Sequence, residues 1–376
     1  MSLGWSLRGQ FGHLHGAAIP GAFAAAAVAL THCDRRWSEA FGWSVMFSVA
    51  GFAVGGHLSY GSTIERLLEA TSLSAMIPGL LRLSCLGAAW GGLGLTFLGY
   101  AISERPFRLP ELGLFGFVAL CWILLLGVMN QESLDLVLFW LGLVCLHGYN
   151  GLVSRSRIVR IFGLAGVVGF GLGFPVATLL LSAGHHGRFG DGWPWWTLRD
   201  QIIGGCGGLA LAWVRLAVDR RGLFPARTFR STFSQVAGFG CFLIGVPAVN
   251  MIDVLTSWSV ERPILPSGRA MAAIFVAGAG MLPAMLLSLR FWKVSVSTVE
   301  VSRRSREVVR MATLIAIWWL SALAIAKETV PLGLGRWEPA FTFFILFSLA
   351  ITVLLEAERK RQRFGASYYR EGNSEV

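Results

Sequence analysis

Residues 161–182 read IFGLAGVVGFGLGFPVATLLLS and contain no charged side chain. A helix needs about 20 consecutive apolar residues to cross the hydrocarbon core of a bilayer, so this run predicts a membrane-spanning helix. The hydropathy of the 376-residue chain predicts ten further spans. In order, the eleven predicted spans lie near residues 17–32, 41–61, 83–102, 112–129, 134–152, 161–182, 202–218, 233–252, 270–289, 311–326 and 339–355.

The composition agrees with a chain that lies mostly in lipid. Hydrophobic residues make up 55% of it, charged residues only 14%, and the mean hydropathy is +0.62. An ordinary soluble domain has about 25% charged residues, so a typical soluble enzyme is excluded. The runs are continuously apolar and do not alternate with polar residues, which favours helices over a membrane barrel. The predicted fold class is all-α, a polytopic integral membrane helical bundle of about 11 transmembrane helices.

The two sides of the membrane differ in the charge of their predicted loops. The side of the C-terminus carries 23 Lys and Arg against 11 Asp and Glu, and the other side carries 9 against 10. Basic loops stay in the cytoplasm during insertion, so we expect an inner (cytoplasmic) membrane protein with its C-terminus in the cytoplasm and its N-terminus outside. Insertion and anionic lipid explain the net charge of +11, and no nucleic-acid partner is expected. The basic loops include Arg155, Arg157, Arg160, Arg220, Arg221, Arg227, Arg230, Arg303, Arg304, Arg306 and Arg310.

Processing and cofactors can also be judged from the sequence. The first apolar run, 17–32, also matches a cleaved secretory signal, but its long polar leader and its counterpart in the second half of the chain favour a retained span. The six cysteines are scattered, without a C-x-x-C pair, and predict neither a disulfide nor a metal site. The Gly-rich run 204–208 lies inside an apolar span and lacks the Lys-Ser/Thr ending of a phosphate loop. We therefore expect no metal and no cofactor.

A weak internal repeat relates the two ends of the chain. Residues 5–10 read WSLRGQ and residues 196–201 read WTLRDQ, each before an apolar span and 191 positions apart. Residues 49–52 and 236–239 both read VAGF, in the second and eighth predicted spans. Chance matching of short motifs is the alternative. Because the matches occur in the same order, we favour a duplication that gives two five-helix halves of the same orientation, joined by one helix.

The repeat divides the chain into four parts. A first five-helix half (1–153) is followed by a connecting helix and outer loop (154–190), a second five-helix half (191–356) and a charged cytoplasmic tail (357–376). Parallel halves resemble, in architecture, those of the large facilitator superfamily of 12-span transporters. The resemblance does not extend to motifs, because no Gly-x-x-x-Asp-Arg-x-Gly-Arg loop follows the second span.

Two arginines occupy equivalent positions in the repeat. Arg8 and Arg199 lie near the predicted outer surface, and Gln10 and Gln201 lie two residues deeper. A guanidinium group binds carboxylate or phosphate through two parallel hydrogen bonds, so the pair predicts a site for an anionic solute or a lipid-linked head group. The alternative is that each arginine reaches out to lipid phosphate or pairs with a neighbouring Glu. Two further arginines of the outer loops, in the Glu65-Arg66 and Glu261-Arg262 pairs, are assigned to the same site.

Histidines add candidates on the same side of the membrane. His57 ends the second span in a Gly-rich segment, and we expect it to line the same cavity, with a hydrogen bond between helices as its alternative role. His13 and His15 lie close to Arg8 and have no counterpart in the second half. If the protein is an enzyme, His13 is the candidate catalytic base; otherwise no catalytic residue is assigned.

The predicted spans contain no Asp or Glu near their middle. Coupled pumps usually keep a carboxylate at that depth, so we expect passive transport or flipping without strong ion coupling. The predicted function is a membrane transporter or flippase for an anionic or sugar-bearing, lipid-linked solute. An integral-membrane transferase that acts on a lipid-linked substrate at the outer face is the first alternative, and a structural subunit of a membrane complex is the second. The predicted substrate-binding residues are Arg8, Gln10, His57, Arg66, Arg199, Gln201 and Arg262.

Overall fold

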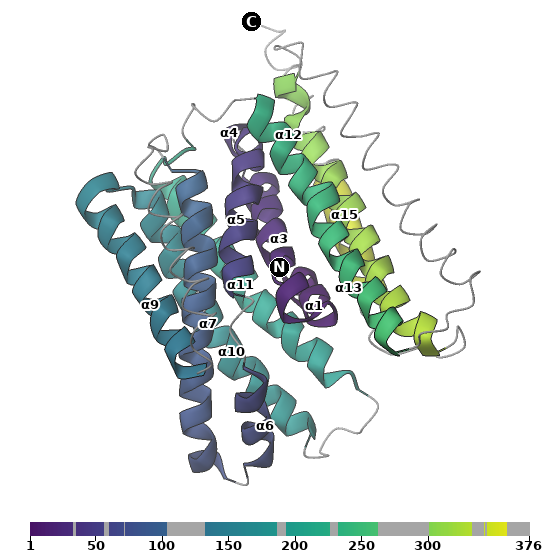
Figure 1. Ribbon diagram of the computed structural model, residues 1–376. Coiled ribbons are helices and arrows are strands. Elements are labelled where there is room, and N and C mark those ends of the chain that lie inside the picture. Colours follow the sequence, from purple (N-terminus) through teal and green to yellow (C-terminus); the bar gives the residue numbers. More distant parts are fainter. Residues whose placement is uncertain are drawn as a thin grey trace, which may run out of the picture.

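The computed structural model describes most of the chain as helices, and the described segments contain no strand (Figure 1). These segments are residues 1–32, 35–55, 60–70, 72–103, 132–185, 193–225, 232–261, 301–332, 342 and 344–358.

Five of the described helical stretches are long and apolar enough to cross a membrane. They run along α7 (Leu73–Ala101), α10 (Arg157–His185), α11 (Trp195–Arg220), the continuous stretch of α12 (Thr232–Gly240), the π-helix η3 (Cys241–Gly245) and α13 (Val246–Glu261), and α15 (Val301–Leu332). The protein is thus an all-helical integral membrane protein, as its composition predicts. The number of eleven spans stays a prediction, because the spans near 112–129 and 270–289 lie outside the described residues.

Shorter helices occupy several of the other predicted spans. They are α3 (Ala18–Thr31), α5 (Phe41–Gly55), α9 (Glu132–Tyr149), which continues into the π-helix η1 (Asn150–Ser154), and a helix at 344–358. Short helices also lie at α1 (Ser2–Gln10), α2 (Gly12–His15), α4 (Arg35–Glu39) and α6 (Gly61–Glu69). At a rise of about 1.5 Å per residue, α3 is about 21 Å long, less than the about 30 Å of the hydrocarbon core.

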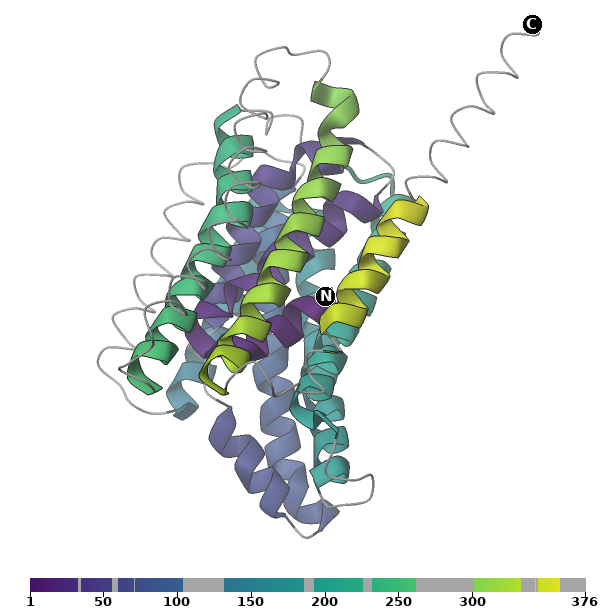
Figure 2. The ribbon, with the colours of Figure 1, turned by 90° about the vertical axis from the view of Figure 1, so that its right-hand side faces the viewer.

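The helices form two groups with α3 and α5 between them (Figure 1). On one side α7 packs against α9 and α10, and α10 packs against α11; on the other side α13 packs against α15. Helix α5 contacts both α7 and α12, so it joins the groups. Figure 2 shows α15 between α13 and the 344–358 helix. A hydrogen bond between the hydroxyls of Ser321 on α15 and Ser348 joins α15 to that helix.

Small residues let α7 and α10 touch backbone to backbone. A Cβ atom on Gly166 of α10 would collide with the carbonyl oxygen of Gly91 on α7, and one on Gly87 would collide with the carbonyl oxygen of Phe170. Close approach of this kind is typical of membrane helices, which gain little hydrophobic driving force from each other in lipid. The pair therefore forms a rigid wall beside the candidate site.

The first helical segment is broken just before α3. Helix α1 ends at Gln10, and Gly12 takes a φ of +75°, a left-handed conformation that favours glycine. Helix α1 lies across the middle of the bundle, between α11 and α15 (Figure 1). The break thus brings both Arg8 and the C-terminal end of α1 into the interior of the bundle. The sequence predicts this segment only as a polar leader before the first span.

Candidate functional site

Arg8 and Arg199 lie on two helices that pack directly against each other, α1 and α11. Their contact is close because Gly204 of α11 has no side chain: a Cβ atom there would lie 2.7 Å from Cα of Ser2 and 2.8 Å from Cβ of Trp5. Ser6 donates a hydrogen bond through Oγ to the carbonyl oxygen of Thr197, at 3.3 Å. Ser6 and Thr197 are themselves 191 positions apart, the same offset as the two arginines.

The guanidinium group of Arg8 is enclosed by aromatic rings. The side chain is 2% exposed, and its Nη1 donates a hydrogen bond to the hydroxyl of Tyr60. Its Cζ lies 4.9 Å from the ring centroid of Trp90, 5.2 Å from that of Tyr60 and 5.8 Å from that of Trp5. A cation over an aromatic face is worth about 2 kcal/mol when water is excluded, so these rings replace part of the lost hydration.

Arg199 approaches the same tyrosine and is equally buried. Its Cζ lies 5.1 Å from the ring centroid of Tyr60, and its side chain is 2% exposed. Nη1 pairs with Asp200 Oδ1 at 3.0 Å, and Nε donates to Thr178 Oγ1 at 3.4 Å. Nη2 is buried and meets no hydrogen-bond acceptor among the described residues. Arg199 therefore has one donor position that the described part of the protein does not use.

Tyr60 lies in a continuous aromatic cluster. Trp5 lies 5.1 Å from both Trp90 and Phe170 between ring centroids, and Phe174 lies 5.5 Å from Tyr60. Trp90 is fixed by a hydrogen bond of 2.9 Å from Nε1 to the carbonyl oxygen of Phe52. A wall of packed rings excludes water and strengthens the interactions of any charge held against it.

The arginines lie deeper than the sequence predicts. Their aromatic partners Trp90 and Phe174 lie near the middle of α7 and α10, away from the ends of these long helices. Neither arginine reaches out to lipid phosphate, since both are 2% exposed. For this pair the alternative of snorkelling to the membrane surface is wrong, whereas pairing with a neighbouring acid does occur at Arg199, through Asp200.

The other predicted binding residues are placed differently. Gln201 is buried, and its Nε2 has no acceptor among the described residues. Gln10 accepts a hydrogen bond from Lys327 through its backbone carbonyl oxygen. Arg66 is exposed on α6 and donates to the carbonyl oxygen of Ser62 at 3.0 Å, so no described contact joins it to the arginine pair. His57 and Arg262 lie outside the described residues. His13 belongs to α2, and its side chain is also outside the description.

A second charged cluster lies at the end of α1, and the sequence reasoning missed most of it. Asp253 of α13 accepts from Lys327 of α15 at 2.7 Å and lies 3.1 Å from Nδ1 of His15 on α2. Lys327 also donates to the carbonyl oxygen of Gln10, at 2.8 Å. From the sequence, Asp253 is expected only in a solvated polar rim at the end of the eighth span, and Lys327 is not a candidate. A signal was present, because Asp253 and Lys327 directly follow apolar runs, and ionisable residues within membrane segments are usually paired.

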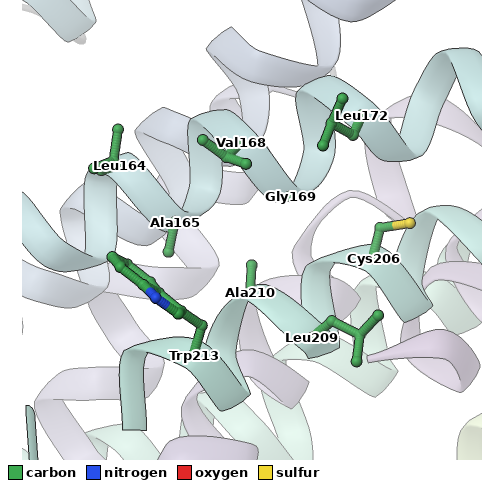
Figure 3. Close-up of a pocket in the computed structure, with 9 residues that line it drawn as sticks. All are labelled: Leu164, Ala165, Val168, Gly169, Leu172, Cys206, Leu209, Ala210 and Trp213. Carbon is green, nitrogen blue, oxygen red and sulfur yellow. The ribbon is translucent and has the colours of Figure 1, made fainter. Parts of the chain in front are cut away.

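An apolar groove of about 360 Å³ lies between α10 and α11 (Figure 3). Leu164, Val168 and Leu172 line it from α10, and Trp213 lines it from α11. Its lining contains no charged residue, and Leu172 is 59% exposed. In a bilayer this surface faces acyl chains, and it is separate from the arginine pair.

The described residues contain no group of three or more His, Cys, Asp or Glu side chains placed to hold a metal ion. Comparisons with known protein families, with curated proteins and with solved structures found no match for this chain.

Proposed function

We propose that the protein is a membrane transporter or flippase that passes a solute bearing a carboxylate or phosphate group along the arginine pair. The observation that carries this proposal is the convergence of Arg8 and Arg199 on Tyr60, inside the bundle and away from water. Charged side chains at such depth are costly to the fold, and in membrane proteins they usually belong to a pathway or a binding site.

The donors around the pair favour an anion. Arg199 Nη2 and Gln201 Nε2 are both buried without an acceptor among the described residues. A buried donor that makes no hydrogen bond costs about 1–3 kcal/mol. A carboxylate or phosphate oxygen bound there would remove that cost, and a guanidinium group matches both anions with two parallel hydrogen bonds.

We further propose that the two halves of the chain are an internal repeat and that the protein has a defined orientation in the membrane. Three observations support the repeat: the equivalent arginines share Tyr60, the equivalent Ser6 and Thr197 are hydrogen-bonded, and α5 and α12, which carry the two VAGF motifs, pack together. We place the protein in the inner membrane with its basic loops in the cytoplasm, following the charge asymmetry of the loops.

Transport is tested with the full-length protein in liposomes. One arm of the experiment uses a free anion, and the other uses a lipid with an anionic head group. The first arm measures uptake of labelled sulfate, and the second measures flipping of fluorescent phosphatidylglycerol by its accessibility to dithionite. We expect activity in at least one arm for the unmodified protein and a loss of tenfold or more in Arg8→Gln and in Arg199→Gln, since removing a charged hydrogen-bond donor costs about 1.5–3 kcal/mol.

The matched control is Arg215→Gln. Arg215 lies on the same helix as Arg199, but its side chain is 40% exposed and it faces Asp219 near the other end of α11. We expect this variant to keep the activity. Equal rates for the unmodified protein and both Arg8 and Arg199 variants in the two arms would contradict the proposal.

A further inference from the structure

The C-terminal end of α1 carries a partial negative charge, and a lysine on another helix neutralises it. A helix leaves its last carbonyl oxygens without an intrahelical donor and carries a partial negative charge at that end. Because α1 stops at Gln10, its carbonyl is free for the ammonium group of Lys327, which donates to it from α15 at 2.8 Å. Broken membrane helices often place a cation at such an end, and here the protein supplies the cation itself.

Asp253 connects this contact to the imidazole of His15 on α2. Its carboxylate receives Lys327 on Oδ2 at 2.7 Å and faces His15 Nδ1 from Oδ1 at 3.1 Å. The side chains of Asp253 and Lys327 are 17% and 16% exposed, and that of His15 is 39% exposed. His15 is therefore the most accessible of the three side chains, while the pair behind it is mostly enclosed.

We propose that His15, Asp253 and Lys327 form a proton-binding site that is coupled to the anion site through α1. This inference rests on the proposed function, and it replaces the expectation of transport without strong ion coupling by coupling to protons. One proton from water binds the imidazole of His15 and leaves from the same ring, and no covalent bond of the protein is formed or broken otherwise. Histidine is the side chain whose ordinary chemistry lets it gain or lose a proton between pH 5 and 8.

The direction of the coupling follows from the charges. The charged groups near His15 include Asp253 on α13 and Lys327 on α15, and Arg8 lies on α1, which precedes α2. Protonation of His15 adds a positive charge next to Asp253, which is already paired with Lys327. The added positive charge near the end of α1 favours an anion at Arg8. We expect acid to strengthen anion binding.

The coupling is measured as the stabilisation of the purified full-length protein by sulfate, in detergent, at pH 5.5 and pH 7.5. Sulfate suits this test because its own charge stays constant over this range. We expect the unmodified protein to bind sulfate at least about fivefold more tightly at pH 5.5, a modest value for coupled sites. In His15→Gln, we expect sulfate binding to remain and its pH dependence to disappear.

Two controls make the result specific. His147→Gln changes a histidine of α9 that is bound to Thr96, away from the cluster, and it should keep the pH dependence. In liposomes, sulfate uptake by the unmodified protein should carry protons and acidify the interior, as reported by pyranine, and the acidification should be lost in His15→Gln.

The outcomes separate this inference from the proposed function. Sulfate binding that is the same at both pH values, or a pH dependence that survives in His15→Gln, overturns the proton site and leaves the anion site standing. If neither sulfate nor phosphatidylglycerol is bound or moved at any pH, both proposals are overturned.

Discussion

The two charged regions of the protein are built in opposite ways. Arg8 and Arg199 are fully enclosed, and aromatic rings on the long helices α7 and α10 lie against them, while Arg199 is also paired with Asp200 beside it. The cluster of Asp253, Lys327 and His15 is partly exposed and is held by ion pairs between α2, α13 and α15. Closely packed rings fix the position of a charged group, whereas partly exposed ion pairs can exchange partners. The arginine site is thus preorganised, and the cluster at the end of α1 is adjustable.

The largest effect should come from disturbing the rigid wall. In Gly166→Val, the new side chain must displace the backbone of α7 at Gly91. We expect destabilisation of about 3 kcal/mol or more, since overpacking of a tight interface leaves no room for relaxation. Thermal unfolding in detergent measures the effect. Gly240→Ala is the control, because a Cβ atom there meets nothing within 4 Å, and an unchanged melting temperature in Gly166→Val would refute the rigid wall.

Removing one member of the ion cluster should have the next largest effect. Asp253→Asn and Lys327→Met each leave a mostly enclosed charge without its main partner, and we expect each to cost about 2–3 kcal/mol. The double variant should be more stable than either single variant, because neither charge is left behind. A thermal double-variant cycle measures the coupling, and strictly additive losses would show that the two side chains do not stabilise each other.

A smaller effect is expected from Tyr60→Phe. This change keeps the ring that both arginines face but removes the hydroxyl that accepts from Arg8. We expect a loss of about 1–2 kcal/mol in stability, and sulfate binding should weaken severalfold because Arg8 is positioned less firmly. Sulfate titration by thermal shift gives both values, and Tyr60→Leu, which also removes the ring, should be worse on each measure.

The smallest effect concerns His32, just beyond the end of α3, which stacks on Trp37 at 3.9 Å and faces Asp219 of α11 at 3.3 Å. Burial lowers the pKa of His32 below its usual value of 6.5, and this outweighs the opposing pull of Asp219. The unfolded chain therefore binds a proton more readily, and the contribution of His32 to stability is lost as the pH falls below 6.5. Melting curves between pH 5 and 8 should show a shallower decline in His32→Gln, and an equal or steeper decline would oppose this sign.

The sequence predicted the arginines but not what holds them. The repeat brought Arg8 and Arg199 to notice, and the structure places both against Tyr60. The tyrosine could not be chosen in advance, because five tyrosines and fifteen tryptophans are spread over the chain. Lys327 was missed for a similar reason. Its partners Gln10 and Asp253 lie 317 and 74 residues away, and only the fold brings them together.

The composition and the apolar runs by themselves determine an all-helical membrane protein, because a backbone in lipid must satisfy its own hydrogen bonds and the helix is the local way to do so. These requirements act within one segment and are visible in its residues. The break at Gly12, the mid-depth position of Arg8 and the ion cluster at the end of α1 were decided by tertiary structure. They depend on which helices pack side by side, and that arrangement is a property of the whole chain.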